Sequence, residues 1–254
     1  MRVLVCLKQV WEPESLFDLQ EGELRPQHPP RLKLSSYDEL ALEETLRLKD
    51  RLAQVQVTAL SVGPPSVVEA LRRALGMGAD QAVHILAPDH PPPRPATLAS
   101  WIAAWAGEQQ FDLILAGVMS EDAMQGAVGP MLAAKLRLPV VTSVVSLEPK
   151  EDALTVEREM EGGRRQRLAV DLPALVTVQS GPNQPRYPTL SNLLRAKKTT
   201  PLTLEAAGLQ DPAEREKVLH QAPPEKRRAG LVLKGDTSQK AEQLLTILRE
   251  RSLL

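Results

Sequence analysis

Residues 55–86, VQVTALSVGPPSVVEALRRALGMGADQAVHIL, carry the pattern that decides the fold. The β-branched run at 55–61 predicts a buried strand, and the Gly-Pro that follows predicts a turn. Ser66 and Glu69 have the spacing of a capping box, which predicts a helix that ends in the following Gly-Met-Gly. Residues 82–86 predict a second strand. A strand, a helix and a strand in this order are typical of a parallel sheet covered by helices.

Short apolar runs alternate with amphipathic segments on both sides of this unit. Ser36 and Glu39 form another capping box, which predicts the helix before residue 55. Further strands are predicted at residues 2–7, 111–116, 140–147 and 173–179, and further helices at residues 36–52, 96–106 and 130–137. The whole pattern predicts an α/β fold, a Rossmann-like three-layer parallel sheet.

Two hairpins are predicted outside this alternation. Residues 154–160 and 164–170 flank Glu161-Gly162-Gly163, which has the chemistry of a β-hairpin turn, and we expect this added β-hairpin to extend one edge of the sheet. A smaller hairpin is predicted around residues 20–23.

The sequence changes character near Ser180, where we expect the globular core to end. Residues 201–228 contain several prolines and no long periodic run, so we expect a C-terminal arm that lies on another surface. Asp236 is predicted to cap a final helix that runs to about residue 249.

Composition excludes several classes of function. The 31 basic and 32 acidic residues nearly cancel, so no overall field recruits nucleic acid or an anionic membrane. Cys6 is the only cysteine, which excludes an internal disulfide and a cysteine-cluster metal site and suits a reducing compartment. The start lacks the features of a secretory signal, and no apolar run is long enough to cross a bilayer. We therefore expect a cytoplasmic protein without membrane insertion.

The candidate ligand site is at the carboxyl ends of the predicted strands, because open parallel sheets bind ligands there. The ends that can converge are those at residues 6–8, 61–63 and 116–117. Gly117 and the glycines at 126–129 precede a helix, and their backbone N–H groups could face a phosphate. A tight strand-to-helix turn explains the same glycines, and their spacing alone does not separate the two interpretations.

Residues for other chemistry are not grouped. The four histidines are scattered, and the sequence holds no Ser-His-Asp or Cys-His set. Cys6 lies in a predicted buried strand, which favours a core thiol over a reactive one, although its backbone could still contact a ligand.

Several motifs, in order, resemble the β subunit of electron-transferring flavoproteins. They are VLVCLKQV, YDELALEETLRLKD, VTALSVGP, ALRRALGMGAD, FDLILAG, AVGPMLA, VEREMEGG, LPALVTVQSGPNQPRYPTL and SNLLRAKK. The likeness runs from Arg2 to about Lys198. It implies an adenine nucleotide alpha hydrolase-like fold, with a nucleotide-binding α/β domain at residues 1–184. Residues 185–254 would then be a partner-recognition segment and a C-terminal arm with a terminal helix.

The resemblance implies a heterodimer in which an α subunit holds most of a shared FAD and this chain binds a structural AMP. The chain would then be an electron carrier subunit without bond-making chemistry of its own. It would pass electrons from acyl-CoA-type or other flavin dehydrogenases toward a quinone-linked acceptor oxidoreductase.

The resemblance also implies the contacts to AMP. They fall at Cys6, Ser35, Ser36, Tyr37, Asp38, Val62, Gly117, Ser120, Asp122, Gln125, Gly126 and Val128. The chain departs from the family pattern, since Ser35-Ser36 replaces the common Asn-Pro. Residues 118–125 also lack the usual Arg-Gln and Asp-Gly-Asp-Thr, which leaves Ser120 and Gln125 as polar candidates for the phosphate. Tyr37 could approach the flavin or simply belong to the helix core.

Residues 185–198, here called the recognition segment, correspond to the loop with which the family docks its dehydrogenase. Leu190 is the implied anchor, and Arg195 and Lys198 are implied to steer toward acidic partners. Leu193 and Leu194 could instead hold the segment to its own complex. Glu159 matches an acidic residue that contacts the mobile flavin domain, although an edge-strand glutamate is usually only solvated.

Two alternatives stay open. A second FAD replaces AMP in relatives that bifurcate electrons. An autonomous adenylate-binding regulator or enzyme is the alternative from a different class.

Overall fold

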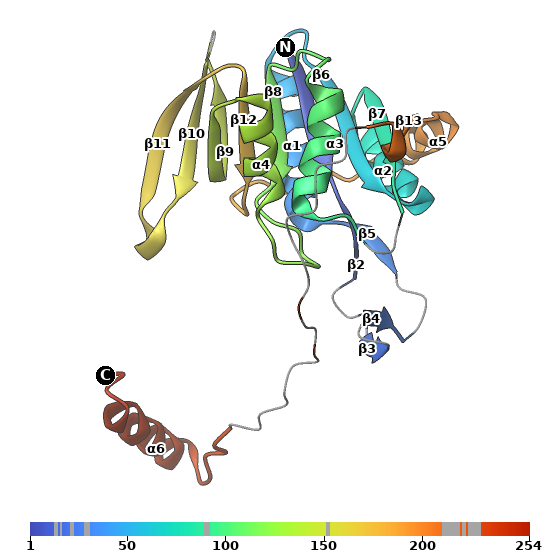
Figure 1. The fold of residues 1–254 in the computed structure, drawn as a ribbon. Coiled ribbons are helices and arrows are strands. Elements are labelled where there is room, and N and C mark those ends of the chain that lie inside the picture. The colour runs from blue at the N-terminus through green and yellow to red at the C-terminus, as the bar shows by residue number, and fades with distance from the viewer. Residues whose placement is uncertain are drawn as a thin grey trace.

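The computed structural model describes residues 1–12, 15, 17–20, 23–27, 31–88, 92–150, 153–209, 219, 222 and 230–254. These residues form a nine-stranded sheet with the order β11-β10-β9-β12-β8-β1-β6-β7-β13 (Figure 1). Its strands are β1 (Arg2–Leu7), β6 (Gln56–Gly63), β7 (Gln81–Leu86), β8 (Leu113–Gly117), β9 (Val140–Pro149), β10 (Ala153–Glu159), β11 (Arg165–Asp171), β12 (Ala174–Val178) and β13 (Leu202–Glu205).

The sheet is mostly parallel. Strand β1 pairs in parallel with β6 on one side and β8 on the other, and β12 pairs in parallel with β8 and β9. Only the β9-β10-β11 edge is antiparallel, so the predicted hairpin does extend one edge. Two short antiparallel pairs lie apart from this sheet: β2 (Gln9–Trp11) with β5 (Leu32–Leu34), and β3 (Phe17–Gln20) with β4 (Glu23–Pro26). The second pair confirms the strands of the smaller hairpin, whose turn residues 21 and 22 lie outside the described residues.

Helices cover both faces of the sheet, which confirms the three-layer α/β fold. Strand β1 shows why, because its side chains alternate between two cores. Val3 and Val5 join the core beneath α1 (Ser36–Arg51), α2 (Val68–Met77) and α5 (Leu190–Lys198). Leu4 joins the core beneath α3 (Pro95–Ala106) and α4 (Val128–Leu136).

Both capping boxes predicted in the sheet domain are wrong. Ser36 is already helical, and its hydroxyl accepts a hydrogen bond from Lys33 Nζ at 3.2 Å instead of capping α1. Glu39 pairs with Arg73 of α2. Before α2, consecutive prolines favour a 3₁₀ turn, η1 (Pro65–Val67), so Ser66 lies inside that turn and cannot be the cap.

The expectation that the core ends near Ser180 is also wrong. Strand β13 adds to the sheet beside β7, and Ala206, in the 3₁₀ turn η3 (Ala206–Gly208), is buried in the core beneath α3. Another 3₁₀ turn, η2 (Glu161–Gly163), closes the edge hairpin. The final helix is confirmed as α6 (Thr237–Glu250), where Asp236 and Gln239 form a complete capping box. Figure 1 shows α6 apart from the sheet.

Leu115 tests the central core, because it lies in β8 and is fully buried. We expect Leu115→Ala to lower the free energy of unfolding by about 2–5 kcal/mol, since it removes buried methyl groups and leaves a cavity. Leu253→Ala is the control, because Leu253 is 65% exposed. Urea denaturation measures both variants, and equal midpoints for the two would contradict this account of the core.

Candidate functional site

Strands β1 and β8 are neighbours at the centre of the sheet, and the region just beyond their carboxyl ends is the candidate ligand site, called the crevice here. Helix α1, which lies between β1 and β6 in the chain, packs on one face, whereas α4, which follows β8, packs on the other. The carboxyl ends of these two adjacent strands therefore form a topological switch point, the usual ligand site of an open parallel sheet.

Asp38 bridges this switch point. Its Oδ2 accepts a hydrogen bond from the backbone N–H of Lys8, just after β1, at 2.7 Å. Its Oδ1 accepts one from the backbone N–H of Gly117, the last residue of β8, at 2.8 Å. One carboxylate in the first turn of α1 thus fastens the ends of two strands.

The carboxylate of Asp38 is buried, and desolvation by burial raises its pKa from 3.8 to about 7. The N–H donors of Gly117 and Lys8 and the charge of Lys8 act against this rise, whereas the negative charge of Asp122 adds to it. Asp38 therefore changes its charge near neutral pH in the folded protein.

Gly117 has to be glycine at this position. A Cβ there would lie 2.5 Å from Asp38 Oδ1 and 2.7 Å from Tyr37 Cβ, closer than real Cβ contacts. The first turn of α1 can approach β8 so closely only because this residue has no side chain.

The loop that follows Gly117 places two carboxylates over the start of α1. Glu121 Oε2 accepts hydrogen bonds from the backbone N–H of Ser36 at 3.1 Å and from Lys33 Nζ at 3.0 Å. Partial burial raises the pKa of Glu121, but these two partners outweigh it and leave the pKa below its usual value. Asp122 Oδ1 pairs with Lys8 Nζ at 2.8 Å. Both lysines at the crevice are thus neutralised by the loop.

Several predicted residues meet at the crevice. Asp38, Gly117, Ser36, Tyr37 and Asp122 are joined there by the contacts above. Glu121 and Lys33 were not predicted, because their pairings are not visible in local spacing. Lys8 was expected at the site as a residue at the end of the first strand, but its ion pair with Asp122 was not predicted.

The remaining predicted residues border the crevice or its loop. Cys6 lies in β1 and is buried, and burial raises the pKa of its thiol to about 12, with a smaller contribution from Asp38, in keeping with a core thiol. Val62 lies near the end of β6, on the side of β1 away from β8. Backbone hydrogen bonds between Ser120 and Gln125 and between Met124 and Ser120 close the loop, and Gln125 and Gly126 are exposed.

Unsatisfied polar groups near this end of the sheet could hold a nucleotide. The hydroxyl of Ser35, the residue before α1, is fully buried and has no hydrogen-bond partner, and the same holds for Ser61 of β6. At α4 no side chain caps the first turn, so the N–H groups of Val128 and Gly129 stay available. Because the lysines are already paired, the site fits a ligand held mainly by hydrogen bonds and helix N–H groups.

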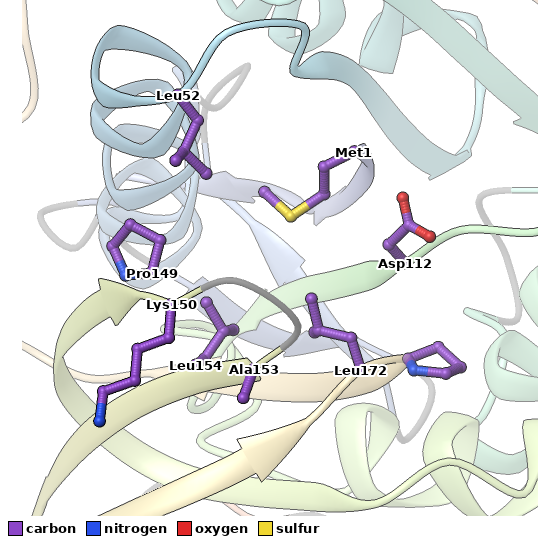
Figure 2. A pocket seen from close by; sticks show the side chains of 9 residues that line it. Met1, Leu52, Asp112, Pro149, Lys150, Ala153, Leu154 and Leu172 are labelled. Carbon is purple, nitrogen blue, oxygen red and sulfur yellow. The ribbon is translucent and has the colours of Figure 1, made fainter.

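A separate hollow of about 630 Å³ lies at the opposite, amino-terminal end of the strands (Figure 2). Its lining residues are Met1, Leu52, Asp112, Pro149, Lys150, Ala153, Leu154, Leu172 and Pro173. Asp112 is already engaged there, because Arg2 N donates a 2.6 Å hydrogen bond to its carboxylate. This end of an open parallel sheet is not where such folds bind ligands.

The recognition segment presents apolar side chains outward. Leu190 begins α5 and is 74% exposed, and Tyr187 is 89% exposed. Leu193 packs on α2, where its Cδ2 would lie 2.9 Å from a Cβ on Gly76. Leu194 is 54% exposed in this chain. The leucines are therefore divided between the outer surface and the contact with α2.

Polar residues of the segment and of the edge hairpin are also exposed. Thr189 caps α5 by accepting a hydrogen bond from Asn192 N at 3.2 Å, and Arg195 donates one to Asn192 Oδ1 at 3.1 Å. Lys198, in the last turn of α5, is exposed. Glu159 is exposed at the end of β10 and accepts a hydrogen bond from Gln179 Nε2 at 2.9 Å. The docking and flavin-domain roles of these residues stay predictions.

The described part of the chain contains neither a cluster of metal ligands nor a helix that could span a membrane. Within it, no group of three or more His, Cys, Asp or Glu side chains is arranged to hold a metal ion. Within it, too, no helix has the length and hydropathy needed to cross a membrane.

Comparison with known proteins identifies the family. The model of the electron transfer flavoprotein domain family matches residues 27–209. The electron transfer flavoprotein subunit beta of Bacillus subtilis is 32% identical over 257 residues, which cover 99% of each chain. The protein of the same name from Syntrophomonas wolfei is 30% identical over 244 residues, 96% of this chain and 94% of the relative. The human subunit beta is 34% identical over 208 residues, 78% of each chain.

The similarity to the Bacillus subtilis subunit covers 99% of the chain and therefore includes both the crevice and the recognition segment. The chain therefore belongs to the electron transfer flavoprotein domain family, and its near-full-length relatives are β subunits.

Proposed function

We propose that this chain is the β subunit of a heterodimeric electron transfer flavoprotein, that it binds AMP in the crevice between β1 and β8, and that it docks a flavin dehydrogenase through Leu190. The α subunit would hold most of the FAD, whose isoalloxazine ring carries the electrons. Near-full-length similarity to β subunits is the observation that carries this proposal.

The crevice supports the AMP assignment through its free hydrogen-bonding groups. The first turn of α4 offers backbone N–H groups to a phosphate, and the partial positive charge of a helix start favours an anion. The buried hydroxyls of Ser35 and Ser61 lack partners, which is costly unless a ligand or water supplies one. Asp38 positions the site, because it fixes the strand ends and the start of α1 around it.

The loop after β8 is where the chain departs most from the family pattern. Residues 118–125 carry Glu121 and Asp122, which bind Lys33 and Lys8. We infer that this loop contributes structure and backbone groups to the nucleotide, with Ser120 and Gln125 as its polar side chains.

The exposed start of α5 supports the docking role. A leucine that enters an apolar pocket contributes about 2 kcal/mol, which suits a partner that must dissociate after each transfer. Arg195 and Lys198 on the same helix would favour an acidic rim around that pocket. Glu159, at the far edge of the sheet, would contact the mobile flavin domain of the α subunit. The chain itself would make or break no bond, and the acceptor would be a quinone-linked oxidoreductase.

Counting nucleotides tests the cofactor assignment. We expect one flavin and one AMP per heterodimer after denaturation, measured by absorbance and by chromatography of the released nucleotides. Two flavins and no AMP would instead indicate a second FAD, as in bifurcating relatives. A colourless chain that is folded and active without an α subunit would support an autonomous adenylate-binding protein.

Asp38 predicts a specific dependence of stability on pH. Its pKa is about 7 in the folded state and 3.8 as the ordinary value, so between these values the folded state binds more protons than the unfolded state. Its contribution to the free energy of unfolding therefore falls as pH rises through this window, by at most about 1.4 kcal/mol per pH unit. Relative to Asp38→Asn, the wild-type protein should lose stability across the window, as urea denaturation measures. A difference that stays constant with pH would contradict the buried carboxylate.

Leu190→Ala tests docking. We expect the substitution to lower the rate constant for flavin reduction at low concentrations of a reduced acyl-CoA dehydrogenase by up to about 30-fold, the equivalent of about 2 kcal/mol. Flavin content and heterodimer assembly should be unchanged. Leu231→Ala is a matched control, because Leu231 is also 74% exposed but lies outside the recognition segment. Equal kinetics for the two variants would refute the docking role.

A further inference from the structure

Arg186 fastens the recognition segment to helix α1. Its Nε and Nη2 donate to the two carboxylate oxygens of Glu43, each at 2.9 Å, and its backbone N–H donates to Glu43 Oε2 at 3.0 Å. Nη2 also donates to Asp50 Oδ2 at 2.7 Å. Arg186 therefore spans two carboxylates that lie two turns apart on one helix.

Burial makes the contact with Glu43 the dominant one. The side chain of Glu43 is only 6% exposed, whereas that of Asp50 is 59% exposed. A buried carboxylate is stable only when it is paired and hydrogen-bonded, and Arg186 supplies three donors to this one. The hydrogen bonds that Arg186 donates to Glu43 and Asp50 raise the pKa of Arg186, so the guanidinium stays charged.

The chain on both sides of Arg186 is held as well. Asn183 is buried, and its Nδ2 donates to the carbonyl oxygen of Leu40 in α1 at 3.1 Å. After Arg186, Pro188 has a restricted backbone and Thr189 caps α5. Only three residues separate Arg186 from Leu190. On the far side of Leu190, Leu193 packs against α2 and Ala196 is buried.

Leu190 is thus exposed, whereas the chain segments before and after it are both held in place. Arg186 fixes the flank toward α1, and the apolar contact with α2 fixes the other. A side chain held in its binding conformation loses less conformational entropy on docking than one on a mobile loop.

We propose that Arg186 is a positioning residue for docking, which holds Leu190 in the conformation that the dehydrogenase pocket accepts. This inference rests on the proposed docking role of Leu190. It assigns to Arg186 no contact with the dehydrogenase, so that its effect is transmitted through Leu190 alone.

A double-mutant cycle on the assembled heterodimer tests the proposal. The first variant is Arg186→Lys, which keeps the charge beside Glu43 but loses the planar fork that reaches both carboxylates. We expect it to raise the concentration of a reduced acyl-CoA dehydrogenase that gives half-maximal flavin reduction by about three- to tenfold. The maximal rate at saturating dehydrogenase and the flavin content should stay the same.

The second half of the cycle places the same change in the Leu190→Ala background. A residue that acts through Leu190 has nothing left to position there, so we expect Arg186→Lys to have no further effect. A merely structural role predicts the same fold-change in both backgrounds, and that result would overturn the proposal. An unchanged half-maximal concentration in the single variant would also overturn it.

Two further variants keep the test decisive. Glu43→Gln combined with Arg186→Gln removes both charges and leaves no buried charge unpaired, so it should assemble and show the same loss as Arg186→Lys. Arg73→Lys is a matched control, because Arg73 also pairs with a carboxylate of α1, Glu39, but lies outside the recognition segment.

The results distinguish failure of the docking function from failure of the positioning role. If Leu190→Ala itself has no effect, the docking function fails. If Leu190→Ala has its effect and Arg186→Lys has none, only the positioning role fails.

Discussion

A single buried carboxylate holds the carboxyl ends of the two central strands together. Asp38 accepts the backbone N–H groups that follow β1 and end β8, so the two central strands and the start of α1 meet at one point. Several features depend on this contact: Gly117 cannot carry a side chain, and the loop after it leaves at a fixed place. The carboxylate is costly to bury, which its raised pKa reflects, and the two N–H donors offset part of that cost.

Periodicity predicted the parts of the fold whose residues interact with near neighbours in sequence. The runs at 2–7, 55–61 and 111–116 contribute central strands buried on both faces, so they are mostly apolar and easy to recognise. Strand β13 was missed because it is short, lies at an edge and exposes Leu202 and Glu205. The helix cap predicted at Asp236 was correct, whereas the capping box predicted at Ser66 was wrong, because the prolines before Ser66 turn the chain first.

The residues of the candidate site were likewise predicted only in part. Rules about strand ends and the family likeness together indicated Asp38 and Gly117. They did not indicate the pairs of Ser36 with Glu121 or of Glu43 with Arg186, which are separated by 85 and 143 residues in sequence. Local spacing contains no information about such contacts, because the tertiary fold alone brings the partners together. The missed residues are therefore charged side chains whose partners lie on distant elements.

Helix α1 serves the crevice and the recognition segment at once. Asp38 faces the strand ends from its first turn, and Glu43 and Asp50 face Arg186 from later turns. An α-helix turns by about 100° per residue, so an insertion or deletion between Asp38 and Glu43 would rotate one set of carboxylates away from its partners. The number of residues between Asp38 and Glu43 is therefore constrained in this protein, because one continuous helix determines the direction in which both of these carboxylates point.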